Sequence, residues 1–270
     1  MKSKAILAAS LPIVASALLL ASGGMAKAGL IGFYNFDGTT NDVSGSNHNP
    51  VAGTISGYTA GFEGQAGIFN GASNRLQLPI DVSPSVMPAL TMGAWVSAIA
   101  TTGRRAILSA DDALPGDYDR QIGIDNRVGG ATTGTYAYSA FAGSNTGVIS
   151  SGQAVVPVWT FVAARYVGTS VTLFVNGQSF SGSDTNADPV QFSQLWIGKN
   201  PSFDSYFSGY IDNAFVFDQA LTDADVSSIQ TGGESAILAL AAVPEPATVA
   251  VGLLCLGVGL VRRRRNSVAK

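Results

Sequence analysis

Short runs of alternating apolar residues dominate the sequence between residues 30 and 217, and glycine, asparagine, aspartate and serine separate these runs. Alternation with a period of two indicates strands that turn one face toward a core. A chain with many such runs and almost no helical pattern favours an all-β sandwich or jelly roll of two antiparallel sheets. We expect strands at 30–36, 65–70, 75–79, 91–98, 105–109, 121–125, 135–140, 161–167, 171–180, 194–197 and 209–217.

Two turn signals refine this pattern. Asn176-Gly177 follows a β-branched run, and both residues accept a positive φ, so we expect a hairpin there. The polar turn at 71–74 is expected to join the runs on either side of it as a pair of strands.

One short helix is expected near the end of the domain. Thr222, with Asp225 three residues later, forms a capping box that starts a helix over 223–229. Gly232-Gly233 is expected to end it. The residues that follow, 235–242, are expected to form a last strand or a short spacer.

The N-terminus has the pattern of a secretory signal peptide. Lys2 and Lys4 give a basic start, 5–21 is an apolar run, and Ala26-Lys27-Ala28 is a cleavage site of small residues. We therefore expect residues 1–28 to be removed.

The C-terminus combines a rigid break, an uncharged segment and a basic block. The uncharged segment, 247–261, would form a transmembrane helix of roughly 22 Å at about 1.5 Å per residue, short of a hydrocarbon core of about 30 Å. The break and the block consist of Val243, Pro244, Glu245 and Pro246, and of Arg262, Arg263, Arg264 and Arg265. The expected organisation is a signal peptide (1–28), a β-sandwich domain (29–235), a spacer (236–242), the tail (243–265) and a cytoplasmic end (266–270).

This tail resembles the PEP-CTERM sorting signal of Gram-negative bacteria in all three of its parts. The resemblance implies a membrane-held intermediate, processing by an exosortase-type enzyme, and release to the cell surface or an exopolysaccharide matrix. Glu245 would then be a signal residue. The alternative is a plain anchor that is never cut.

Charge and cysteine content restrict the function of the exported part. Between residues 29 and 243 there are seven basic and seventeen acidic residues, which leaves ten net negative charges. Such a surface argues against nucleic acid or anionic lipid as a partner. The single cysteine, Cys255, lies in the tail, so the domain can form no disulfide and has no catalytic thiol.

The domain resembles a bacterial laminin G-like, or concanavalin A-like, jelly roll. The resemblance implies two antiparallel sheets stacked face to face, with the first and last strands side by side. Five segments carry it in family order, namely Gly32–Asn49, Gly64–Pro79, Leu90–Ala98, Trp159–Gln178 and Leu195–Val226.

Calcium is the candidate cofactor, because many domains of this kind bind it through carboxylate and carbonyl oxygens. The resemblance assigns Asp42, in an Asp-x-Ser-Gly loop, and Asp212, in the closing strand, with Asp37 as a third ligand. The alternative is that Asp42 and Asp212 only accept hydrogen bonds from turn amides.

Aromatic residues in the central region could stack on sugar rings. The candidates are Tyr118, Tyr136 and Tyr138, although the last two could instead share one packed face of a sheet. Trp95, Trp159 and Trp196 are expected in the core, since each lies in an apolar strand context.

The expected function is an exported surface or matrix protein, without enzymatic activity, that binds glycan (exopolysaccharide) or mediates adhesion. A structural protein that binds another surface protein is the alternative. A glycoside hydrolase of the same fold would need two facing carboxylates, and no close glutamate pair occurs, since Glu63 and Glu234 are far apart.

Overall fold

The computed structural model describes residues 29–111, 119–143, 147–183 and 194–242. They belong to one compact unit, Lys27–Pro244. The signal peptide, Tyr118 and the tail from Val243 onward lie outside the described residues. No helix in the described ranges is long and apolar enough to cross a membrane.

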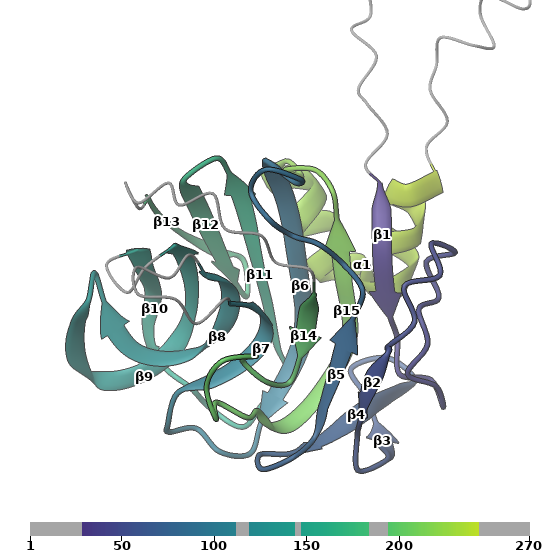
Figure 1. The fold of residues 1–270 in the computed structure, drawn as a ribbon, viewed down its shortest axis with the longest axis horizontal. Coiled ribbons are helices and arrows are strands. Elements are labelled where there is room, and N and C mark those ends of the chain that lie inside the picture. Colours follow the sequence, from purple (N-terminus) through teal and green to yellow (C-terminus); the bar gives the residue numbers. More distant parts are fainter. Residues whose placement is uncertain (1–28, 112–118, 144–146, 184–193, 243–270) are drawn as a thin grey trace, which may run out of the picture. The chain divides into compact units, whose positions relative to one another are not determined.

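Two antiparallel sheets make up the domain, as the sequence predicts (Figure 1). The first sheet has eight strands in the order β13-β12-β11-β6-β15-β4-β3, with β1 also paired to β15. These strands are β1 (Leu30–Tyr34), β3 (Tyr58–Ala60), β4 (Gln65–Asn70), β6 (Ala89–Ala98), β11 (Thr160–Val167), β12 (Ser170–Val175), β13 (Gln178–Ser183) and β15 (Ser208–Phe217).

The second sheet has seven strands in the order β10-β9-β8-β7-β14-β5-β2. They are β2 (Ala52–Thr54), β5 (Arg75–Leu78), β7 (Arg105–Ala110), β8 (Asp119–Val128), β9 (Ala131–Gly143), β10 (Val148–Ala154) and β14 (Leu195–Ile197).

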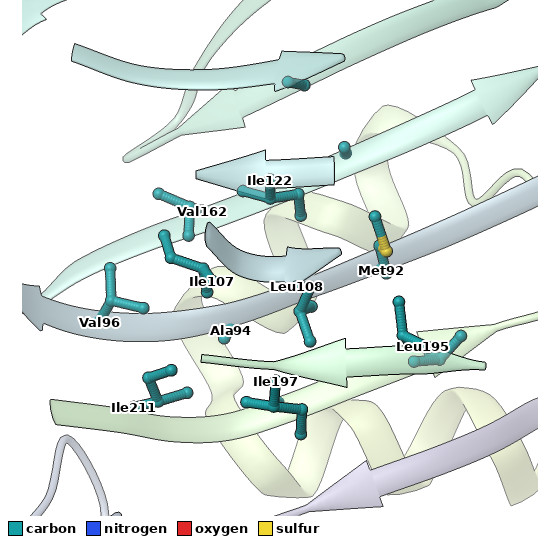
Figure 2. Packing of buried hydrophobic residues seen from close by; sticks show 14 of the residues in the cluster. Met92, Ala94, Val96, Ile107, Leu108, Ile122, Val162, Leu195, Ile197 and Ile211 are labelled. Carbon is teal, nitrogen blue, oxygen red and sulfur yellow. The ribbon is translucent and has the colours of Figure 1, made fainter. Parts of the chain in front are cut away.

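The main core lies between the sheets. Alternate residues of each strand point inward, as the period of two requires. Figure 2 shows members of this cluster from both sheets, among them Met92 and Ile211 from the eight-stranded sheet and Leu108, Ile122 and Leu195 from the seven-stranded sheet.

A second hydrophobic cluster covers part of the opposite face of the eight-stranded sheet. There the helix α1 (Asp223–Ala242) packs Val226, Ile229 and Ile237 against Trp95 and Phe215 of the sheet. The domain is therefore layered as helix, eight-stranded sheet and seven-stranded sheet. On the outer face of the seven-stranded sheet, Ser109, Gln121 and Phe141 are buried, and Gln77 and Trp196 are partly exposed.

Several local expectations are confirmed. β1 pairs with β15, so the first and last strands are neighbours. Asn176 and Gly177 form a two-residue turn between β12 and β13, with φ of 44° and 83°. The capping box also forms, because the amide of Asp225 donates to Thr222 Oγ1 at 3.1 Å and the amide of Thr222 donates to the Asp225 carboxylate at 3.0 Å.

Two expectations are wrong. The turn at 71–74 does not join a strand pair, because β4 belongs to the eight-stranded sheet and β5 to the other. Residues 235–242 are neither strand nor spacer but continue α1, which is broken at Gly233 (φ 56°, ψ −141°) and then resumes. Ile237, which is fully buried, holds this second half against the sheet.

Candidate functional site

A row of side chains runs across the outer face of the seven-stranded sheet. Strand register aligns Gln77 of β5, Trp196 of β14, Ser109 of β7, Gln121 of β8 and Phe141 of β9. Their strand neighbours on the other face are buried, and all of them except Arg120 belong to the main core. The row therefore faces away from the core, and we call it the outer row.

Trp196 is the half-buried aromatic residue of the outer row. The Arg75 guanidinium lies 5.5 Å and the Lys199 ammonium 5.7 Å from the centre of its ring. The expectation that Trp196 belongs to the core is wrong, because Leu195 and Ile197 on either side take the core positions and force the indole to the other face.

A hydrogen-bonded network beside Trp196 holds the loop that follows β14. Asn200 Nδ2 donates to Asp111 Oδ2 at 2.7 Å and to Gln121 Oε1 at 2.9 Å, and Ser109 Oγ donates to the same Gln121 oxygen. The Asn200 side-chain oxygen in turn accepts the amide of Phe203 at 3.0 Å. Phe203 is 53% exposed, so this rigid loop presents an aromatic ring to water.

The other end of the same face carries an ion-pair group. Asp125 is buried and accepts from Arg127 Nη2 at 2.7 Å, while Arg104 Nε lies 3.6 Å away. The Arg127 guanidinium also covers the ring of Phe141 at 5.1 Å. The Asp125 carboxylate therefore forms its ion pairs with two arginines of the same chain.

A second group of interest, the acidic cluster, consists of Asp37, Glu63, Asp212 and Glu234. It forms where β15 changes neighbours, from β4 at 208–211 to β1 at 214–217. The pairing of β15 is irregular at this point, and Asn213 has φ of 47°. Asp37 follows β1 and Glu63 precedes β4, so the topology brings both to Asp212.

Hydrogen bonds connect three members of the acidic cluster, Glu63, Asp212 and Glu234. The amide of Glu63 donates to Asp212 Oδ2 at 3.0 Å. The Glu63 carboxylate accepts from Asn213 Nδ2 at 2.8 Å and from the amide of Glu234 at 2.7 Å. Because Glu234 restarts α1 after the break, Glu63 caps the second half of the helix from a distant loop.

Asp212 is the most perturbed carboxyl group of the acidic cluster. It is fully buried, and its Oδ1 has no hydrogen-bond partner. Burial raises the pKa of Asp212 from 3.8 to about 7; hydrogen bonds, including that of the Glu63 amide, lower it in part, and the charge of Asp37 raises it further. Burial also raises the pKa of Glu234, and the charges of Asp37 and Glu63 add to this effect.

The remaining predicted metal ligand, Asp42, accepts hydrogen bonds outside the acidic cluster. Its carboxylate accepts the amides of Phe33 at 3.0 Å and of Ser44 and His48 at 2.9 Å each. None of these partners belongs to the acidic cluster, so the turn-amide alternative describes Asp42. In the parts of the chain that the structure describes, no three histidine, cysteine, aspartate or glutamate side chains are arranged to hold a metal ion.

Two of the predicted aromatic ligands, Tyr136 and Tyr138, do not lie on the outer face. Tyr138 is in the main core, where burial raises its pKa to about 12, and Tyr136 packs against the same core. The alternative of a shared packed face is therefore correct for this pair. Trp95 is buried as expected, and Trp159 is partly buried against the second hydrophobic cluster.

Comparison with known proteins gives a family and a sorting motif. Residues 70–227 match the family described as the concanavalin A-like lectin/glucanases superfamily, and residues 242–265 match the PEP-CTERM protein-sorting motif. This motif marks the chain for export to the surface of a Gram-negative bacterium through a membrane-anchored intermediate, with processing by an exosortase. Comparison with the curated proteins finds no match.

Solved structures with the same fold include both binding domains and enzymes. Domain 4 of AbnA, an extracellular arabinanase from Geobacillus stearothermophilus solved with arabinotriose, is 21% identical with a TM-score of 0.57, over 76% of this chain and 100% of that domain. The binding domain of Paraclostridial Mosquitocidal Protein 1 is 12% identical with a TM-score of 0.56, and 76% of this chain covers 52% of it. Trypanosoma rangeli sialidase is 16% identical with a TM-score of 0.51, over 74% of this chain and 32% of the enzyme.

Sequence reasoning missed the residues that the outer face brings together. Trp196 reads as a core residue because both of its neighbours are apolar. Asn200 and Gln121 carry no local signal, since their network joins residues about 80 or 90 positions apart. The strict alternation in Leu195-Trp196-Ile197 could have placed the indole on the face opposite to the two aliphatic residues.

Proposed function

This chain belongs to the concanavalin A-like lectin/glucanases superfamily, and from that premise we propose that it is a surface protein that binds a glycan on the outer face of its seven-stranded sheet. The observation that carries the proposal is the half-buried indole of Trp196, which lies outside both hydrophobic clusters and beside a satisfied polar network. Sugar rings stack on such indoles, and nearby amide and carboxylate groups bond their hydroxyls. The arabinotriose-bound domain with the same fold supports the use of oligosaccharides as ligands in the test.

The test replaces Trp196 by alanine and measures binding to a panel of bacterial exopolysaccharides and arabinan oligosaccharides by calorimetry. Loss of a central aromatic contact costs about 2 kcal/mol, or about 30-fold in affinity. Trp159→Ala is the matched control, because Trp159 is also partly buried but packs against the second hydrophobic cluster. Wild-type protein that binds no glycan, or equal losses in both variants with the fold intact, would contradict the proposal.

We further propose that the protein binds its glycan without cleaving it. Glycoside hydrolysis uses two free carboxyl groups that flank the scissile bond. On the outer face, Asp125 is engaged by Arg104 and Arg127, and Asp111 accepts the Asn200 amide. Reducing ends released from any bound glycan would refute this part. A protein partner, the structural alternative, would be indicated if surface-protein extracts bound and glycans did not.

Calcium is proposed as a stabilising ion at the acidic cluster. The buried Oδ1 of Asp212 has no hydrogen-bond partner, and the charge of Asp37 acts on the same carboxyl group. A hard cation prefers such oxygens and would neutralise the crowded charges. Equal melting temperatures in calcium and in chelator would contradict the proposal.

A further inference from the structure

The positive charges of the domain are distributed unevenly. The region from residue 29 to 243 has seven basic and seventeen acidic residues. Six of the seven basic residues lie in strands of the seven-stranded sheet or directly beside them, and Arg165 lies in β11 of the other sheet. One of the six, Arg120, is buried on the core side of its strand, over the ring of Tyr166. Arg75, Lys199, Arg104 and Arg127 contact residues of the outer face.

Among the residues that the structure describes, the two cations next to Trp196 have no acidic partner. The ion pairs among the described residues involve Arg104, Arg127 and Arg165. Arg75 donates to the carbonyl of Ser73, and Lys199 to that of Pro201, so within the described ranges neither has a carboxylate partner. Both are partly exposed and flank the indole at 5.5 Å and 5.7 Å.

We infer that the glycan of the outer face is acidic, a polysaccharide whose sugar rings carry carboxylates. This inference rests on the proposed glycan-binding function and names the class of ligand. The apolar face of a sugar ring would stack on Trp196, while its carboxylate would accept hydrogen bonds from the Arg75 fork and the Lys199 ammonium. Charge-assisted bonds of this kind are about twice as strong as neutral ones.

The acidic residues described in the same region do not strongly repel an anionic ligand. Asp111 is buried and accepts the Asn200 amide, and Asp125 is paired with two arginines. The loop's own carboxylate, Asp204, is exposed, where water and salt screen its repulsion. Within the described ranges, the uncompensated charge around Trp196 is therefore positive, in contrast to the net charge of the domain.

The experiment measures the affinity of the full chain in mild detergent for polygalacturonate and for its fully methyl-esterified form. The two polymers have the same sugar and differ in the carboxylate. We expect polygalacturonate to bind at least ten-fold more tightly, with a preference that shrinks as salt rises. Arg75→Gln and Lys199→Gln should each weaken binding of the acidic polymer by about five-fold and leave the esterified polymer unaffected. Arg104→Gln is the matched control, since it removes an exposed cation that pairs with Asp125.

The outcomes distinguish the acidic-ligand inference from the glycan-binding proposal. Equal affinity for the two polymers overturns the acidic-ligand inference and leaves the glycan-binding proposal standing. An equal loss in Arg104→Gln and Lys199→Gln also overturns it, because the preference would then reflect the charge of the whole sheet. If neither polymer binds to the wild-type chain and neutral glycans do, the inference alone falls. If no glycan binds, both fall.

Discussion

Replacing Asp212 by asparagine should make the calcium-free domain more stable at neutral pH. The unfolded carboxyl group ionises near 3.8, whereas the buried group keeps its proton up to about 7. Between these two pH values the folded chain binds more protons than the unfolded chain, so the stability that Asp212 confers falls as the pH rises through this window and is constant above it. Asparagine stays neutral throughout and escapes this loss.

The expected difference in unfolding free energy between the two proteins follows from the same two pH values. Each pH unit corresponds to about 1.36 kcal/mol, so the pKa rise from 3.8 to about 7 sets an upper limit of roughly 4 kcal/mol. Water that reaches the ionised group, and relaxation of the loop, reduce this cost, and we expect roughly 2 kcal/mol in favour of Asp212→Asn at pH 8. Near pH 4 the two proteins should be equally stable.

The assay is urea unfolding of wild type and Asp212→Asn from pH 4 to pH 8 in chelator, and again in calcium. Other carboxylates titrate in both proteins, so the difference between the two curves isolates Asp212. Calcium should raise the stability of the wild type at pH 8 and leave the variant unchanged. A difference that does not grow between pH 4 and pH 8 would refute the claim that burial holds the proton on Asp212.

Three further substitutions test other parts of the structure. Asp42→Ala removes the acceptor of three amides and should cost about 2 kcal/mol, equally with calcium and with chelator; a loss seen with calcium alone would instead place Asp42 in the metal site. Glu63→Ala should cost about 1 kcal/mol and speed hydrogen exchange in the second half of α1, from Glu234 onward, whereas unchanged exchange there would show that this carboxylate does not cap the helix. Gly177→Ala forces a side chain to φ 83° and should cost about 1 kcal/mol by thermal unfolding, while Gly134→Ala, with open space around it, should be nearly neutral; equal costs would contradict the turn assignment.

Sequence alone was sufficient where the signal was local. The Asn176-Gly177 turn and the Thr222 cap depend on residues within three positions of each other. The pairing of β1 with β15 came from the resemblance to a known fold. The resemblance also implied that Asp42 and Asp212 converge, but the Asp42 carboxylate accepts amides outside the acidic cluster.

The predictions that were wrong concern segments whose structure depends on contacts between residues far apart in the sequence. Gly232-Gly233 looks like the end of a helix, but the Glu63 carboxylate, 171 positions before Glu234, caps a new helical segment immediately afterwards. No residue near Glu234 in the sequence indicates that Glu63 caps this segment. In the same way, the turn at 71–74 looks like a hairpin, and the choice of sheet for β4 and β5 is made by β15 and β14, which come more than 100 residues later.

The position of β15 has a consequence for how this protein is made and exported. It is the last strand in the described part of the chain, yet it lies inside the eight-stranded sheet, between β6 and β4 and next to β1. Tyr34 has its partner in Ala214, so the chain must be almost fully extruded before the sheet can close. Contacts of such long sequence separation fold slowly. We therefore expect the domain to cross the inner membrane as an unclosed chain and to complete its sheet only when the tail is about to enter the membrane, so that folding and sorting occur at nearly the same moment.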